Sequence, residues 1–268
     1  MIIYLRKFKD ISKAVQLVAI AKLRKLRKVI ESREYSLFLV LEMFAEINDL
    51  DSTEMRSTLV IITSEKSCCG KINNDILSAS KEAIATCLDE NQLLNVISVG
   101  WKGRVSLSAK FKTALCKSVS DMRDVSFFFS YVISLCVLDT FFDKCVVYFS
   151  KFYKIFEQLA ALYEFRSYNT FFNYAYSIRR NILFFDLLLS NCLLFVKSLY
   201  TYSVCLIVFD ALTETKYSEL GCRAFSMEMA HKNSIDLINL YMLVYNKARQ
   251  AAITTDLLEV VAGAIYTV

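Results

Sequence analysis

The chain has 268 residues, of which 55% are hydrophobic and 22% charged, and its formal net charge is +5. The absence of proline and the presence of only five glycines favour long uninterrupted helices in a chain long enough to bury one or two cores. A single histidine and nine cysteines without a C-x-x-C pair argue against a Cys/His zinc site and against a disulfide-stapled secreted fold.

Residues 1–50 are predicted to form one long helix. Its apolar positions recur at intervals of three and four residues, which is typical of the narrow seam of a coiled coil. Small residues would let a partner helix approach closely. The predicted seam residues are Phe8, Ile11, Val15, Val18, Leu26 and Val29, and the small residues are Ala14, Ala19 and Ala21.

The same helix is strongly basic. Between Arg6 and Lys28 there are nine basic residues and a single acidic one, Asp10. Such a stretch is typical of a nucleic-acid patch, of a membrane-surface helix, or of a surface that faces acidic protein loops. Composition leaves all three open, so a basic coiled-coil adaptor for nucleic acid or membrane stays an alternative.

The middle of the chain predicts a small Rossmann-like α/β domain. Short β-branched runs are typical of buried strands, and the order strand, helix, strand favours a parallel sheet. Beyond a third strand, the aromatic-rich residues 105–210 are assigned no element. The predicted strands are 58–64, 95–100 and 145–149, and the predicted helix is 72–88.

Two apolar stretches, 125–142 and 182–209, have the length of membrane spans. The first contains Asp139, and the second contains Asp186 and Lys197. Because a charge near the centre of a bilayer costs about 2.5–3.5 kcal/mol on insertion scales, both stretches are assigned to a soluble domain. No transmembrane segment is therefore expected.

A second long helix is predicted from Phe225 to Ala262, a stretch without glycine or proline. Two long helices at opposite ends of a chain can pair antiparallel. The predicted organisation is a coiled-coil helix over 1–55, an α/β domain over 56–210, and a second coiled-coil helix over 211–268.

Neither nucleotide binding nor catalysis is predicted. The turn after the first strand reads Ser-Cys-Cys-Gly-Lys, which lacks the first glycine and the final Ser/Thr of a phosphate-binding loop. The lone His231 lies in a polar stretch and is interpreted as a surface residue. No catalytic residue, cofactor or metal is expected.

Several segments resemble the gamma subunit of F-type ATP synthases. The C-terminal run LVYNKARQAAITTDLLEVVAGA matches that family's pattern almost residue for residue. The internal turn departs from it, because Ser67 and Cys68 stand where the family usually has Gly and Leu. The resembling segments are 243–264, 218–227, 11–24 and 63–73.

The resemblance implies a rotary shaft. In the family, the two terminal helices form an antiparallel coiled coil inside a ring of three alpha and three beta subunits. The middle domain binds an epsilon/delta-type subunit and the membrane ring of c subunits, and proton flow turns the shaft to drive ATP synthesis. This implies a peripheral protein of the mitochondrial inner membrane on its matrix side, or of a bacterial plasma membrane on its cytoplasmic side. A non-rotary paralogue remains an alternative.

The resemblance also implies the contact residues. Arg249 and Gln250 match the family positions that hydrogen-bond an acidic catch loop of the beta subunit, and a guanidinium fork suits carboxylates. Thr254 and Asp256 extend this surface. The basic positions that would face other beta loops are Arg223, Lys13 and Lys22. The chain would transmit work, while the beta subunits carry out the chemistry.

Overall fold

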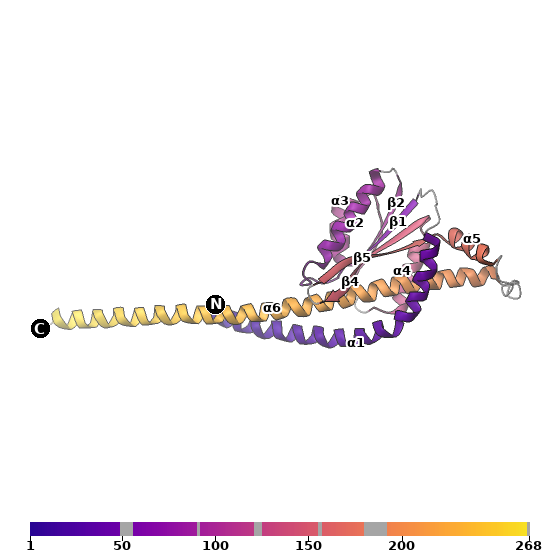
Figure 1. Cartoon of the computed structure of the whole chain (residues 1–268). Coiled ribbons are helices and arrows are strands. Elements are labelled where there is room, and N and C mark those ends of the chain that lie inside the picture. The colour runs from indigo at the N-terminus through magenta and orange to yellow at the C-terminus, as the bar shows by residue number, and fades with distance from the viewer. Residues whose placement is uncertain (49–55, 90–91, 121–124, 155–156, 180–191, 267–268) are drawn as a thin grey trace. The chain divides into compact units, whose positions relative to one another are not determined.

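The computed structural model describes residues 1–48, 56–89, 92–120, 125–154, 157–179 and 192–266 (Figure 1). The chain divides into two compact units. Unit 1 comprises Met1–Ala19 with Ala224–Val268, and unit 2 comprises Ile20–Arg223. The two long helices, α1 (Ile2–Asn48) and α6 (Cys192–Tyr266), contribute to both units. Both predicted terminal helices are thereby confirmed, although α6 begins far upstream of the predicted start at Phe225.

Unit 2 is built on one five-stranded sheet of order β3-β2-β1-β4-β5. The three predicted strands are confirmed as β1, β2 and β4. The first four strands pair in parallel, but β5 runs antiparallel to β4, so the sheet is mixed. The strands are β1 (Arg56–Ile62), β2 (Leu93–Val99), β3 (Leu115–Val119), β4 (Lys144–Lys154) and β5 (Glu157–Arg166).

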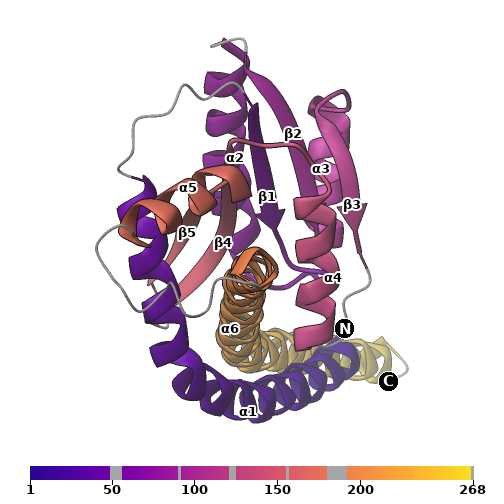
Figure 2. The same ribbon diagram turned by 90° about the vertical axis from the view of Figure 1, so that its right-hand side faces the viewer.

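Helices cover both faces of this sheet (Figure 2). The alternation of side chains along β1 shows the two layers: Leu59 and Ile61 pack into a cluster with α2, whereas Val60 and Ile62 pack into a larger cluster with α4, α5 and α6. The far end of α1 joins the larger cluster through Phe44. The shorter helices are α2 (Ile72–Asp89), α3 (Trp101–Lys110), α4 (Phe127–Leu138) and α5 (Tyr168–Arg179).

This packing accounts for the two apolar stretches. The first contains α4, whose 12 residues are too few to cross a bilayer. In the second, residues 182–191 lie outside the described residues, and the rest belongs to α6. By length and composition α6 could cross a membrane, but half of its apolar window is buried inside the structure. Val204, Ile207 and Val208 are fully buried in the core of unit 2, which is typical of a core helix.

In unit 1 the start of α1 runs antiparallel to α6 (Figure 1). Nδ1 of His231 lies 3.0 Å from the carbonyl oxygen of Lys9, and the amide of Gln16 donates to Glu228 at 3.4 Å. His231 is therefore half-buried between the helices, rather than the surface residue that the sequence indicated. Its ring lies against a backbone carbonyl.

The predicted seam of α1 is wrong at most of its positions, although Val15 and Leu26 are half-buried and the predicted small residue Ala19 is buried. Phe8, Ile11 and Val18 are 50%, 61% and 57% exposed, so they do not face α6. Ser12, Gln16 and Ala19 are the residues buried there, and they are at most 6% exposed. Their spacing of four and three residues is also that of a coiled-coil seam. Small and polar side chains of α1 are therefore buried in this unit together with Ser234 and Ile238 of α6, whereas Phe8, Ile11 and Val18 stay exposed.

Candidate partner-binding surface

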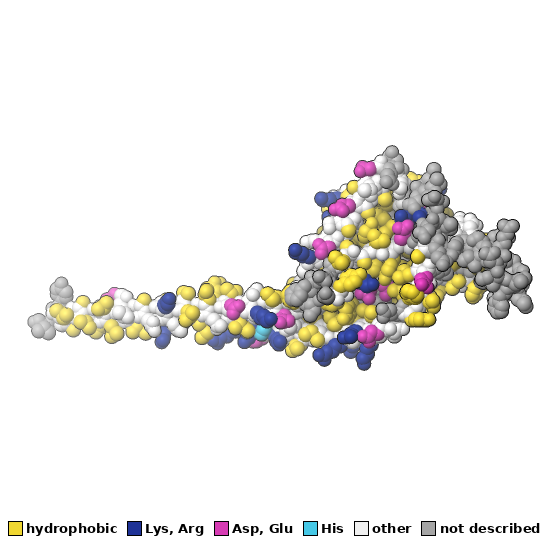
Figure 3. Space-filling model, viewed as in Figure 1, with side chains coloured by type: hydrophobic (Ala, Val, Ile, Leu, Met, Phe, Trp, Pro, Cys, Tyr) yellow, Lys and Arg dark blue, Asp and Glu magenta, His cyan; other side chains and the backbone are white. Residues whose placement is uncertain are grey.

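The C-terminal part of α6 is uncovered within unit 1. From Tyr241 to Ile265 every side chain is exposed, including many large apolar ones. Leu243, Leu258 and Val260 are 64%, 65% and 70% exposed, and Figure 3 shows hydrophobic side chains along this part of the helix. Contiguous exposed apolar surface of this kind marks a site of protein or membrane contact.

Four predicted contact residues lie on this uncovered helix, and all four are exposed. Because successive residues of an α-helix are about 100° apart, Arg249 and Asp256 share one face and Gln250 and Thr254 share another. The hydroxyl of Thr254 donates to the carbonyl oxygen of Gln250 at 2.9 Å. Arg249 and Gln250 therefore lie on two adjacent faces of the helix, and both side chains are exposed.

The three remaining predicted residues lie elsewhere. Lys13 is exposed in unit 1, and its ammonium donates to Oε1 of Gln16 at 3.1 Å. Lys22 is exposed on the part of α1 that belongs to unit 2. Arg223 also belongs to unit 2, where it is half-buried. The prediction that these residues contact a partner stays a prediction.

Arg223 takes part in an internal polar network. Its guanidinium pairs with the carboxylate of Glu219 one turn earlier and donates to Sγ of Cys69 at 3.2 Å. Cys69 is buried in the turn after β1, and burial raises the pKa of its thiol although Arg223 acts in the opposite direction. Glu219 also pairs with Lys216 at 3.1 Å. The sequence pattern contained Glu219 but did not indicate that it holds Arg223 inside the domain.

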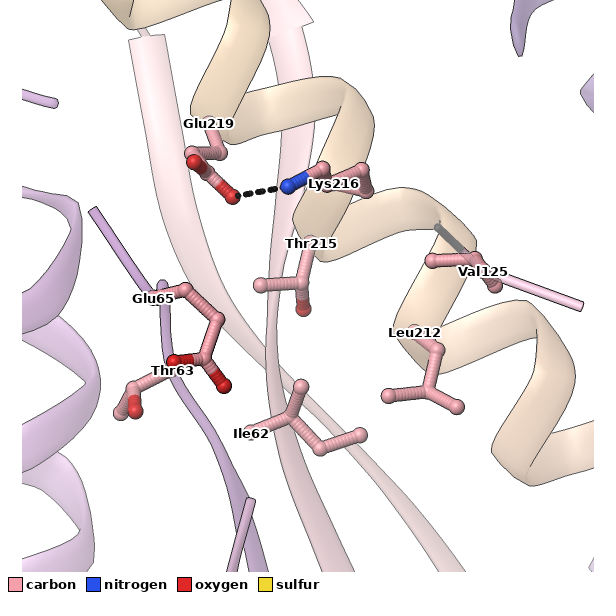
Figure 4. Close-up of a pocket in the computed structure, with 8 residues that line it drawn as sticks. All are labelled: Ile62, Thr63, Glu65, Val125, Leu212, Thr215, Lys216 and Glu219. Carbon is pink, nitrogen blue, oxygen red and sulfur yellow. Dashed lines mark hydrogen bonds and ion pairs between the residues drawn. The ribbon is translucent and has the colours of Figure 1, made fainter. Parts of the chain in front are cut away.

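This network borders a small cavity at the carboxyl end of β1 (Figure 4). In open α/β sheets, ligands bind where the strand order reverses, which here is between β1 and β4. Leu212, Thr215 and Lys216 of α6 close that position, and the cavity of about 10 Å³ has room for one water at most. A nucleotide does not fit there.

The turn that follows β1 is satisfied by its own residues. The amide of Ser64 donates to Oδ1 of Asn73 at 3.0 Å, and the side-chain amide of Asn73 donates back to the Ser64 hydroxyl at 2.8 Å. A wider hollow of about 390 Å³ lies beside Cys68 and Trp101, but no carboxylate or imidazole lines it. These contacts favour the structural interpretation of the turn over phosphate binding.

The terminal helices run antiparallel, the α/β domain lies between them in the sequence, and an apolar helix end is uncovered. These features define a shaft-like subunit that partners surround. The chain belongs to the ATP synthase family, because the family model of that description matches residues 2–265. It is similar to curated relatives named ATP synthase gamma chain. The relative from Pelagibacter ubique is 28% identical over 276 residues, covering 95% of this chain and 92% of the relative. The relative from Cereibacter sphaeroides is 28% identical over 283 residues, covering 96% and 93%.

Solved structures show the same fold. A chain of the Euglena gracilis mitochondrial ATP synthase (OSCP/F1/c-ring) matches with a TM-score of 0.83 and 19% identity, covering 99% of this chain and 92% of that one. A chain of the Tetrahymena thermophila mitochondrial ATP synthase central stalk and c-ring matches with a TM-score of 0.64 and 21% identity, covering 82% and 99%. The predicted fold class and the resemblance to the gamma subunit are thereby confirmed.

Proposed function

We propose that this chain is the rotating central shaft of an F-type ATP synthase and couples proton flow to ATP synthesis. The uncovered end of α6 carries the proposal. Leu243, Leu258 and Val260 leave apolar surface of this helix exposed, which marks a site of contact, and a ring of three alpha and three beta subunits would cover it. The named gamma-chain relatives support the same assignment.

The chain itself would carry out no chemistry. The cavity at the carboxyl end of β1 is too small for a nucleotide, and the described residues contain no cluster of three His, Cys, Asp or Glu side chains able to hold a metal. Asymmetry of the turning shaft would instead force each beta subunit through its catalytic states. The α/β domain would bind an epsilon/delta-type subunit and the c-ring, nucleic acid would not be a partner, and the chain would have no transmembrane segment of its own.

For the contact with the beta catch loop we keep Arg249 and Gln250, extended by Thr254 and Asp256. Both main residues are exposed, so they are free to form charge-assisted hydrogen bonds with a carboxylate. Lys13, Lys22 and Arg223 are proposed as further basic contacts. For Arg223 this requires that the guanidinium keeps Glu219 and offers its remaining donors outward.

The proposed location is the matrix side of the mitochondrial inner membrane. The matched structures are mitochondrial, whereas the curated relatives are bacterial, so the cytoplasmic side of a bacterial plasma membrane is the alternative. Immunogold labelling of the source cells, or fractionation followed by protease protection, separates the two compartments.

Reconstitution tests the function. The chain is mixed with the alpha and beta subunits of its own organism, and ATP-driven rotation of a bead on the α/β domain is recorded. We expect rotation in the parent, and we expect the double variant Arg249→Ala/Gln250→Ala to lower the ATP synthesis rate of the holoenzyme by about tenfold, the effect of one charge-assisted hydrogen bond.

Lys247→Ala is the matched control, because Lys247 is an exposed cation on the same part of α6. It should leave synthesis at the parent rate. Full activity in the double variant would remove the catch-loop assignment while leaving the shaft in place. Absence of the chain from alpha/beta complexes, together with a salt-sensitive affinity for DNA or anionic vesicles, would favour the basic adaptor instead.

A further inference from the structure

Within unit 2, strand β4 extends beyond the end of its parallel neighbour β1. β1 pairs with β4 as far as Ile61↔Tyr148, whereas β5 pairs with it along its whole length. Past Tyr148, the side of β4 that faced β1 has no strand partner among the described residues. Ser150 lies in this stretch and is 2% exposed, so its amide and carbonyl need partners other than water.

Helix α6 supplies both partners. The amide of Ser150 donates to Oγ1 of Thr215 at 3.4 Å, and the hydroxyl of Ser218 donates to the carbonyl oxygen of Ser150 at 3.1 Å. Thr215 and Ser218 are three residues apart, on one face of the helix, and are 3% and 0% exposed. Two side chains of the helix thus replace the missing strand at a single residue of the sheet.

Further contacts join α6 to the same β4–β5 hairpin. The phenol of Tyr163 donates to Asp210 at 2.8 Å, and the phenol of Tyr200 donates to the carbonyl oxygen of Arg166 at 2.8 Å. At Gly221 the helix comes so close that an added Cβ would lie 2.6 Å from the ring of Phe152.

These contacts limit sliding of α6 along the sheet and rolling of α6 about its own axis. Apolar packing of α6 is non-directional, and packed helices can shift past each other between discrete arrangements. The hydrogen bonds at Ser150 do not tolerate such a shift, because a rise of about 1.5 Å per residue moves both hydroxyls out of reach and leaves two buried backbone groups unpaired.

We infer that Ser150, Thr215 and Ser218 form a register lock that makes the α/β domain and α6 turn as one body. The inference rests on the proposed rotor function, since a shaft under load needs a joint that resists sliding and rolling. Thr215 and Ser218 are positioning residues: they act on the shaft helix and not on the nucleotide.

The test uses the whole ATP synthase in sealed liposomes and measures protons pumped per ATP hydrolysed. Thr215→Val keeps the shape of the side chain and removes the acceptor, and Ser218→Ala removes the donor. Two variants serve as controls. Thr215→Ser retains the hydroxyl, and Thr213→Val removes an equally buried hydroxyl that donates to Phe209 within α6 itself.

We expect the double variant Thr215→Val/Ser218→Ala to pump fewer protons per ATP than the parent, because each lost hydrogen bond favours the displaced register by about tenfold. Both controls should keep the parent ratio. A purely structural role would lower the amount of assembled enzyme without changing this ratio. A parent-like ratio in the double variant would overturn the lock.

A second measurement serves if the double variant fails to assemble. In the free chain, the Ser150 amide should exchange with solvent about tenfold faster in Thr215→Val than in Thr213→Val. Equal rates would overturn the lock. A parent chain that exchanges as expected but never rotates would defeat the proposed function while leaving the lock standing.

Discussion

Glu219 and Glu31 each pair with an arginine four residues away on the same helix, but their surroundings differ. The Glu219 side chain is 3% exposed and holds both Arg223, 13% exposed, and Lys216 at 3.1 Å. In Glu219→Gln the shape is kept, yet two cations remain half-buried without their counter-charge. Breaking a buried pair costs about 3–5 kcal/mol, and the partial exposure of the cations favours a value near about 3 kcal/mol.

Glu31→Gln is the matched control. Its pair with Arg27 has a similar bond of 2.8 Å, but the two side chains are 59% and 69% exposed, so water replaces the lost charge. Urea unfolding of the free chain, followed by far-ultraviolet circular dichroism, gives the free energies of unfolding. We expect a clear loss for Glu219→Gln and none measurable for Glu31→Gln. At about 1 M salt the screening length falls to about 3 Å, and the loss for Glu219→Gln should persist. Equal midpoints for the two variants would refute the argument that burial decides the strength of these pairs.

Three further predictions follow from packing and charge. Phe44 is 1% exposed among aromatic rings, so Phe44→Ala should destabilise unit 2 by about 3–5 kcal/mol, whereas Phe38→Ala, at a position 55% exposed, should shift the urea midpoint little. Gln16→Leu should slow amide exchange in unit 1, because it replaces a buried amide by an apolar group of similar size. Faster exchange would contradict the argument that this buried amide adds no stability over an apolar side chain. Lys117 lowers the pKa of Asp139 by a hydrogen bond and by its charge. The pair therefore stabilises the folded chain above the pKa of the unfolded carboxyl group, and this stability is lost as the pH falls through the lower folded pKa. Asp139→Asn should remove that part of the acid sensitivity below about pH 4 in thermal melts.

The elements with strong local signals could be predicted from the sequence. The β-branched runs at β1 and β2 and the uninterrupted patterns of α1 and the end of α6 were placed correctly, because side-chain periodicity and missing breakers act locally. The start of α6 could not be placed. Phe195, Val204 and Val208 lie in a stretch rich in apolar residues, and periodicity does not distinguish a helix from a buried strand there. Only packing against the sheet decides that this stretch is a helix.

The candidate site shows the same limit. The C-terminal pattern identified Arg249 and Gln250, and their exposure agrees with a contact role without testing it. It also assigned Arg223 to a partner, although the structure directs its guanidinium towards Glu219 and Cys69. A sequence pattern marks which residues a family uses. Whether a charge points inward or outward depends on neighbours that are far apart in the sequence, as Cys69 and Arg223 are.

The failed seam prediction has a physical reason that bears on function. The start of α1 carries two stripes with the spacing of a coiled coil: an apolar one at Phe8, Ile11, Val15 and Val18, and a more polar one at Ser12, Gln16 and Ala19. Hydrophobicity alone favours burying the first. The structure buries the second, in the unit in which Ser234 and Ile238 of α6 are also buried. Most of the apolar stripe is thereby left exposed, in the same unit as the uncovered end of α6. Apolar surface that is left exposed in the free chain marks a site where a partner binds. A shaft that turns inside a ring of subunits requires such a surface.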